Sequence, residues 1–439
     1  MWRMVLTTAI IFLGWSLAGD VASAGPRDEH SQLTLAQNES QSESALRRII
    51  VELETGSVDE TRLEPQLLAA IRQQLPNVRM LLGQLGALQR VEVIGSQNGA
   101  QIYRVIFTNG PTIWAIALSP NGKIAVLSFR PEPAATQTRD PNGEDVSVAG
   151  LSGTLRKPAR VERPPVVLLV AGSGPTDRDG NQPGRAPSEL RQIAEGLAER
   201  GIASLRYDKR AIGRSPLPAG FREEDLVLDN FVDDAAVWLA WLDQRPDLGP
   251  KFVAGHSEGG LIAILLAKRV PLGGIVLLAT PGRRVGETTR EQLSAAGLPP
   301  PLLDEALTIL AALERGERVA NVSAPLMPLL RPSIQPFMRS LLALDPAREL
   351  ARLRVPVLVV QGGHDLQVSN ADADALLHAR PDAAAFRSPE MNHVLKVASA
   401  DRSAQQQAYS DPAIPLAPGL VEAIVAFVRA QQAVTQPRH

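Results

Sequence analysis

The spacing of apolar residues divides the chain into segments of different kinds. Residues 45–53 and 63–85 carry apolar side chains at helical intervals. Four short segments then alternate or run apolar, and Asn-Gly-Pro and Pro-Asn-Gly turns separate the last three of them. Helices followed by a strand meander predict a small α+β domain over residues 45–130. The predicted strands of this domain are Val91–Val93, Ile102–Phe107, Thr112–Leu118 and Ile124–Phe129.

From residue 146 onward, continuous apolar runs alternate with helical patterns. Apolar runs of this kind are typical of a mostly parallel sheet with helices on both faces. Residues 281–352 interrupt the alternation with a Pro- and Leu-rich helical pattern, which predicts an insertion between two strands. The predicted strands are Gly150–Leu155, Val166–Val170, Ile202–Tyr207, Phe252–Gly255, Gly274–Ala279, Val355–Gln361 and Ala383–Arg387, and the predicted helices are Leu190–Glu199, Leu226–Leu242, Leu261–Lys268, Ala371–Ala379 and Val421–Gln431.

Three stretches lie outside these patterns. Residues 1–24 combine a basic start, an apolar core and an Ala-Ser-Ala cleavage site, which predicts a secretory signal peptide. An uncleaved N-terminal anchor is the alternative, although the apolar run is short for a membrane span. Residues 25–44 are polar and predict a disordered tail. Residues 131–145 hold three prolines and few apolar residues, which predicts a linker.

Composition narrows the functional classes. None of the 439 residues is a cysteine, which excludes a disulfide framework, a thiolate nucleophile and a Cys-ligated metal. With a formal net charge of −2, the chain lacks the excess of basic residues that is typical of nucleic-acid-binding proteins. We expect a bacterial protein that is exported to the periplasm or secreted and keeps no stable membrane anchor after signal cleavage. We expect it to use no cofactor or metal and to bind no nucleic acid. A homo-oligomer stays open, because the small N-terminal domain could mediate dimerisation.

The strongest chemical signal lies where a predicted strand meets a predicted helix. Residues 255–259 read Gly-His-Ser-Glu-Gly, a G-x-S-x-G motif with Ser257 at its centre. A serine nucleophile has to project from a sharp turn, and glycines leave room for that backbone. The start of the following helix directs free N–H groups at developing negative charge. Ser257 is therefore the candidate nucleophile, and an ordinary glycine-containing turn is the alternative.

An acid and a histidine follow Ser257 in the order that such a motif requires. Asp365 comes directly after the predicted strand at 355–361, and His393 comes after the next predicted strand. We predict that His393 takes the proton of Ser257 and that Asp365 orients the imidazole. One other histidine lies within the motif, and another precedes the acid. Two other acids follow a predicted strand less directly than Asp365 does. These less favoured candidates are His256, His364, Asp345 and Asp372.

A glycine-rich loop predicts the remaining part of the site. Residues 171–181 follow a predicted strand and read Ala-Gly-Ser-Gly-Pro-Thr-Asp-Arg-Asp-Gly-Asn. Glycines let backbone N–H groups approach a substrate oxygen, so we predict an oxyanion hole formed by the N–H groups of Ser173 and Glu258. A dinucleotide-binding fingerprint is the rival interpretation, but it requires glycine where Asp177 stands.

Charged residues cluster in this loop and after the strand that ends at Tyr207. They predict ion pairs near the site, and their simplest role is to hold two loops in place. The residues are Asp177, Arg178, Asp179, Asp208 and Arg210.

The segment from residue 146 to the C-terminus resembles the α/β-hydrolase superfamily, in particular exported serine esterases with a small N-terminal accessory domain. The resemblance rests on the loop at 172–180, on the elbow around Ser257, and on Arg-Tyr-Asp-Lys-Arg at 206–210 leading to Gly-Arg-Ser. It implies a catalytic α/β-hydrolase domain over 146–439, with the insertion at 281–352 as a cap. It also implies hydrolysis of acyl esters through an acyl-enzyme.

The activity we expect is that of a carboxylesterase acting on short acyl esters, with the ester as a small-molecule substrate. A serine peptidase or thioesterase of the same fold is an alternative, because Gly259-Gly260 after the nucleophile also occurs in serine peptidases. A catalytically inactive binding protein on a hydrolase scaffold is an alternative of another class.

Overall fold

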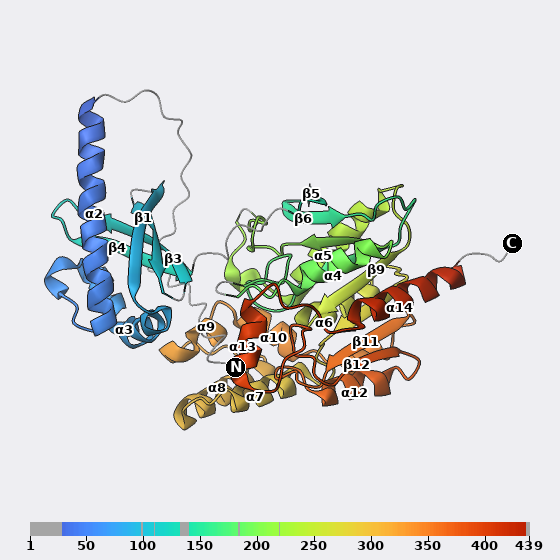
Figure 1. Cartoon of the computed structure of the whole chain (residues 1–439). Coiled ribbons are helices and arrows are strands. Elements are labelled where there is room, and N and C mark those ends of the chain that lie inside the picture. Colours follow the sequence, from blue (N-terminus) through green and yellow to red (C-terminus); the bar gives the residue numbers. More distant parts are fainter. Residues whose placement is uncertain are drawn as a thin grey trace. The chain divides into compact units, whose positions relative to one another are not determined.

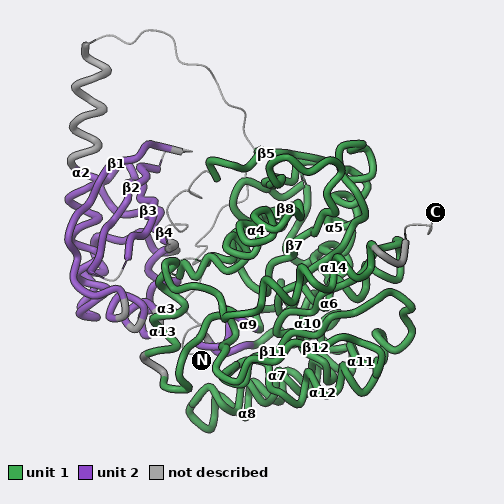
Figure 2. Tube along the Cα trace, turned by 45° about the vertical axis from the view of Figure 1, so that its right-hand side comes forward, with its two compact units in different colours: residues 1–3, 133–321, 330–439 green, residues 4–132, 322–329 purple. Residues whose placement is uncertain are grey.

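The computed structural model describes residues 29–97, 100–108, 110–131, 140–182, 185–218 and 220–435. The predicted signal peptide at 1–24 lies outside these residues. The chain forms two compact units, which Figure 2 shows in different colours. The larger unit holds the described residues of 133–321 and 330–439, and the smaller holds those of 4–132 and 322–329. Within the described part of the chain, no helix combines the length and apolarity that a membrane crossing requires.

One sheet of eight strands forms the centre of the larger unit, in the order β12-β11-β10-β9-β7-β8-β6-β5. Neighbouring strands from β12 to β8 are parallel, whereas β6 runs antiparallel to both β8 and β5. The predicted mostly parallel sheet is thus confirmed (Figure 1). The strands are β5 (Gly143–Val148), β6 (Leu151–Arg156), β7 (Val166–Val170), β8 (Ala203–Tyr207), β9 (Lys251–His256), β10 (Gly274–Leu278), β11 (Val357–Gly362) and β12 (Ala384–Ser388).

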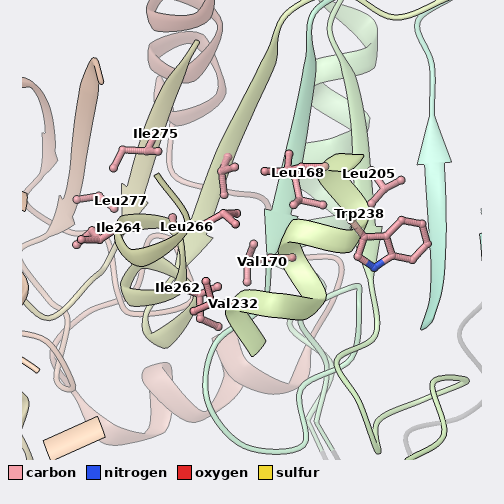
Figure 3. Close-up of a cluster of buried hydrophobic side chains, with 14 of the residues drawn as sticks. Leu168, Val170, Leu205, Val232, Trp238, Ile262, Ile264, Leu266, Ile275 and Leu277 are labelled. Carbon is pink, nitrogen blue, oxygen red and sulfur yellow. The ribbon is translucent and has the colours of Figure 1, made fainter. Parts of the chain in front are cut away.

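Helices cover both faces of this sheet, which is why the central strands β7 and β10 are apolar throughout. The covering helices are α4 (Glu189–Glu199), α5 (Leu228–Asp243), α6 (Glu258–Ala267), α12 (Asn370–Ala379) and α14 (Leu420–Thr435). Every residue of β7 is buried, and its side chains alternate between two hydrophobic clusters. Leu168 and Val170 lie in the cluster that contains Trp238 of α5 and Ile262 of α6 (Figure 3). Leu169 lies in the other cluster, with residues of α4 and α14.

Helices fill the segment between β10 and β11, as the predicted insertion at 281–352 requires. They are α7 (Val285–Ala295), α8 (Pro300–Glu314), α9 (Met327–Leu330), α10 (Gln335–Leu342) and α11 (Pro346–Leu350). Residues 322–329 of this segment group with the smaller unit, so the insertion does not form a single body (Figure 2). A further helix, α13 (Arg402–Ser410), precedes α14.

The smaller unit contains the predicted helices and antiparallel four-stranded meander. Its elements are α2 (Glu29–Thr55), α3 (Pro65–Leu85), β1 (Leu88–Gln97), β2 (Ala100–Phe107), β3 (Gly110–Leu118) and β4 (Ile124–Pro131). Trp114 is fully buried in its core and stacks on Phe129 with ring centroids 4.2 Å apart. The indole N–H of Trp114 donates to Thr112 Oγ1 at 2.7 Å, so burial leaves this polar group paired.

Two boundaries differ from the prediction. Helix α2 begins at Glu29, so residues 29–44 of the predicted disordered tail are helical. Leucine, alanine, glutamine and glutamate favour the helix, and extension adds one hydrogen bond per residue once a helix has nucleated. The predicted linker at 131–145 ends early, because β5 begins at Gly143 and the buried Asp140 accepts a hydrogen bond from Arg156 at 2.5 Å. The apolar pattern missed this start because β5 is an edge strand in which no residue is buried.

Candidate active site

Ser257 lies at the sharp turn between β9 and α6. Its backbone has φ 53° and ψ −117°, and a positive φ costs strain in a residue that carries a side chain. The N–H of Ser257 donates to the carbonyl oxygen of Leu278 at 2.8 Å, which ties the turn to β10. His256 and Glu258 on either side are buried, whereas Ser257 is partly exposed. The turn thus presents the predicted nucleophile to solvent.

Glycines make this turn possible because backbone segments pass too close for a side chain. A Cβ on Gly255 would lie 2.0 Å from the carbonyl oxygen of Gly259. A Cβ on Gly259 would lie 2.2 Å from the carbonyl oxygen of Val170 in β7. Both distances are far shorter than van der Waals contact, so α6 packs directly against the strands only with glycine at these positions.

Asp365, after β11, and His393, after β12, meet beside the sheet. His393 Nδ1 and Asp365 Oδ2 are 2.8 Å apart, and both side chains are almost completely buried. The second carboxylate oxygen accepts the N–H groups of Gln367 and Val368 at 2.7 and 2.9 Å. These bonds fix the carboxylate, which in turn holds the imidazole by Nδ1.

His256 connects this pair to the turn that carries Ser257. Its Nε2 lies 2.7 Å from the carbonyl oxygen of His393, and the two ring centroids are 4.8 Å apart. A carbonyl oxygen only accepts, so Nε2 of His256 donates. Burial, reinforced by the nearby His393, lowers the pKa of His256 to about 3, and the ring is neutral. His256 therefore supports the backbone of His393 through this hydrogen bond.

His393 lies against His256, the residue that precedes Ser257, but its imidazole is not joined to the serine. Across the described residues, no hydrogen bond links the Ser257 hydroxyl to the His393 imidazole. Hydrogen bonds between nucleophile and base are often long before substrate binds.

The less favoured candidates hold other parts of the fold. His364 Nδ1 lies 2.7 Å from the carbonyl oxygen of Ala398. Asp372 is buried and pairs with Arg283 at 3.0 Å. Asp345 caps α11 through its side chain. In the ranges that the structure describes, no group of three or more His, Asp or Glu side chains is arranged to hold a metal ion.

The predicted oxyanion donors lie on segments that flank Ser257. A Cβ on Gly172 would come within 3.4 Å of Ser257 Cβ, so the loop after β7 passes directly beside the nucleophile. Glu258 is the first residue of α6, where N–H groups have no partner within the helix. In the described part of the chain, neither the Ser173 N–H nor the Glu258 N–H donates to a protein acceptor. Both N–H groups therefore remain candidates for the predicted oxyanion hole.

A family model described as serine aminopeptidase, S33, matches residues 188–395, a range that includes Ser257, Asp365 and His393. The match covers the strand–turn–helix around Ser257 and the parallel strands β8 to β12. The larger unit has the α/β-hydrolase fold.

The relatives of this chain include an esterase. The chain is 29% identical over 327 residues to Esterase EstD of Thermotoga maritima, which covers 70% of this chain and 74% of that protein. A solved structure of Est1E from Butyrivibrio proteoclasticus with bound ferulic acid is 17% identical, covers 66% of this chain and 98% of its own, and has a TM-score of 0.43. The solved structure of proline iminopeptidase from Mycobacterium smegmatis is 16% identical, covers 67% of this chain and 100% of its own, and has a TM-score of 0.44. The family match and the esterase relative support a hydrolase.

Buried ion pairs fix the loop after β7 in the α/β-hydrolase unit. Arg178 Nη2 lies 2.6 Å from Asp208 Oδ2, and all atoms of this pair are almost completely buried. Arg206 Nε lies 2.9 Å from Asp179 Oδ1, in a second buried pair. The predicted pairing is confirmed for Arg178, Asp179 and Asp208, and it joins the loop to β8 and its end. Arg210 instead pairs with Asp234 of α5 at 2.6 Å.

Asp177 has a different environment from its neighbours. Its Oδ1 accepts the backbone N–H groups of Asp179 and Asn181, each at 2.9 Å. Burial, together with the carboxylates of Asp179 and Asp208, raises the pKa of Asp177 to about 7. Within the loop, all of which the structure describes, the Asp177 side chain thus accepts hydrogen bonds from backbone N–H groups and forms no ion pair with the neighbouring arginines.

Two buried charged residues near the site were not predicted. Lys209 is 2% exposed, and its Nζ lies between the loop after β7 and Glu258. Glu189 is 1% exposed, with Oε1 3.7 Å from His256 Nδ1, and burial raises its pKa well above the usual value. The sequence holds one signal for Lys209, since it stands in the Arg-Tyr-Asp-Lys-Arg stretch at the end of a predicted strand. Glu189 has the pattern of an ordinary solvated acid in the first turn of a helix.

Proposed function

We propose that this chain is a serine carboxylesterase that cleaves short acyl esters through an acyl-enzyme on Ser257. The observation that carries the proposal is the 2.8 Å contact between His393 and Asp365 beside the strained turn at Ser257. The relative that is 29% identical is named an esterase, which favours an ester over other acyl substrates.

Each group has a role that its position supports. Ser257 Oγ attacks the ester carbonyl carbon while His393 Nε2 takes the hydroxyl proton, and Asp365 stabilises the resulting imidazolium. The N–H groups of Ser173 and Glu258 donate to the oxyanion of the tetrahedral intermediate. His393 then gives the proton to the alcohol oxygen as the carbon–oxygen bond breaks. In the second half, His393 takes a proton from water, the water oxygen attacks the acyl-enzyme, and Ser257 leaves with its proton restored.

Hydrolysis of p-nitrophenyl acetate and butyrate by the full chain tests this proposal. Ser257→Ala should lower kcat by about 10⁶-fold. Its thermal unfolding should match that of the wild type, since the change removes one partly exposed hydroxyl. A fluorophosphonate probe should label the wild type and spare the variant. Near-normal activity of Ser257→Ala would overturn the mechanism, and a folded wild type that neither takes the label nor cleaves an ester would favour a binding protein.

Aminopeptidase activity is the second candidate, because the matching family model is described as serine aminopeptidase. Aminoacyl p-nitroanilides, with acyl thioesters alongside, should be assayed on the same preparation. Ester kcat/KM well above that for the amides would support the esterase, and the reverse order would favour the peptidase.

We also propose that the protein is exported to the periplasm or secreted, with the smaller unit as an accessory domain. Support comes from the signal-peptide pattern of residues 1–24. Expression of the full chain in a bacterial host, followed by fractionation and N-terminal sequencing, tests the proposal. A mature N-terminus at Gly25 in the periplasm or medium is expected, and an intact Met1 in the membrane fraction would favour an uncleaved anchor.

A further inference from the structure

Lys209 places a buried ammonium group directly behind the candidate oxyanion hole. It closely follows β8, and its side chain is 2% exposed. Its Nζ donates to the carbonyl oxygen of Gly172 at 2.6 Å and lies 3.1 Å from Glu258 Oε1. The same nitrogen lies 4.9 Å from the ring centroid of Phe231, which closes the site on another side.

The first contact fixes the direction of one oxyanion donor. In a planar trans peptide, the carbonyl of Gly172 and the N–H of Ser173 point in opposite directions. Lys209 holds the carbonyl, and the N–H is thereby turned away from Lys209. Gly172 has no side chain of its own to restrict this peptide, and it lies within van der Waals reach of Ser257. An external hydrogen bond is the available means of fixing it.

The second contact reaches the residue that carries the other donor. Glu258 contributes its backbone N–H to the candidate oxyanion hole, while its side chain points to Lys209 and is 5% exposed. One ammonium group therefore links Gly172–Ser173 to the start of α6. The charge also polarises the peptide it binds, which strengthens the N–H at the other end as a donor.

A purely stabilising role explains this arrangement less well. Removing two charges from water costs about as much as their attraction returns, so a buried ion pair adds little net stability. Arg210 supplies a nearby ion pair with Asp234, and within the described residues this pair forms no hydrogen bond or ion pair with Gly172 or Glu258. That pair is a matched reference for what a partly buried cation does without contact to the site.

We propose that Lys209 is a positioning residue that orients and polarises the Ser173 donor and anchors the side chain of Glu258, the residue that carries the other donor. The proposal rests on the proposed function, since it assigns Lys209 to the oxyanion hole of a serine hydrolase. Lys209 should act on the transition state more than on the bound ester, because the oxyanion forms only as the tetrahedral intermediate develops.

Lys209→Met removes the ammonium and keeps the length and apolar stem of the side chain. We expect kcat for p-nitrophenyl butyrate to fall by about 10- to 100-fold, somewhat less than for loss of a donor itself, while KM changes by less than about threefold. The affinity for a trifluoromethyl ketone, which forms an oxyanion adduct with the serine, should fall by the same factor as kcat/KM. Lys209→Arg, which keeps a charged donor, should recover part of the loss.

Arg210→Met is the control variant, and it should lower the unfolding temperature while kcat stays at the wild-type value. If Lys209→Met fails to fold, Lys209→Met combined with Glu258→Gln leaves no unpaired buried charge and is measured in its place. Wild-type kcat and ketone affinity in the folded Lys209 variant would overturn the positioning role. Activity retained by Ser257→Ala would instead overturn the proposed function, so the two failures are distinguishable.

Discussion

Asp177→Asn should stabilise the α/β-hydrolase unit at alkaline pH and leave its stability almost unchanged near pH 4. Burial, with Asp179 nearby, raises the pKa of Asp177 from 3.8 to about 7. Between these values the folded chain keeps a proton on Asp177 that the unfolded chain releases. The contribution of this group to stability is therefore complete below pH 3.8 and is lost as the pH rises through about 7.

The size of the effect follows from that span. An interval from 3.8 to about 7 corresponds to about 4 kcal/mol, at about 1.4 kcal/mol per pH unit. Asp177 is partly exposed, so solvent screening reduces the figure, and we expect about 2–4 kcal/mol. Asparagine carries no charge and retains an oxygen for the N–H groups of Asp179 and Asn181, so the variant should gain this amount at high pH.

Urea unfolding of both proteins at about pH 4 and about pH 8 measures the difference for the transition of the larger unit. Asp179→Asn is the control, because Asp179 pairs with the buried Arg206 and its loss should destabilise the unit at about pH 8. A stability difference between wild type and Asp177→Asn that is equal at both pH values would refute the reasoning. A variant less stable than the wild type at about pH 8 would refute it as well.

Further substitutions test the acid and the turn. Asp365→Asn should lower kcat for ester hydrolysis by about 10⁴-fold, because an amide at this place no longer selects the required tautomer of His393. Steady-state kinetics should show this loss in kcat with an unchanged KM. Activity within about tenfold of wild type would contradict the role of Asp365 as the residue that orients His393. Gly259→Ala should destabilise the fold by more than about 3 kcal/mol, since its Cβ would lie 2.2 Å from a backbone oxygen of β7. Thermal unfolding compares it with Gly83→Ala in α3, where nothing lies within 4 Å of the new Cβ and no loss is expected.

The central elements of the larger unit could be predicted because burial imposes a pattern on them. Strands β7 and β10 are buried at every position, and such strands appear as short apolar runs. Strand β5 has no such pattern, because it lies at the edge of the sheet and none of its residues is buried. Its start could not be separated from a linker by apolar spacing alone.

That Ser257, Asp365 and His393 lie at the same edge of the sheet could also be predicted. All three follow parallel strands, and the carboxyl ends of such strands share one edge. The hydrogen bonds that support these residues could not be predicted from the sequence. His256 reaches the backbone of His393 across 137 positions, and Lys209 reaches Glu258 across 49. Side-chain directions over such separations are set by packing, and no local spacing encodes them.

The buried charges of the α/β-hydrolase unit converge on one loop, and this distribution argues for geometry over stability. Arg206 holds Asp179 of this loop and Lys209 holds the carbonyl oxygen of Gly172, whereas Arg178 belongs to the loop and is itself held by Asp208. Each contact carries a desolvation cost that largely cancels its attraction, so together they are a poor means of stabilising a fold. A loop is nevertheless the most mobile kind of element, and an oxyanion donor acts only when it is held at hydrogen-bond distance from the developing charge. Buried cations on one side of the loop supply that constraint while leaving the Ser173 N–H unpaired on the other.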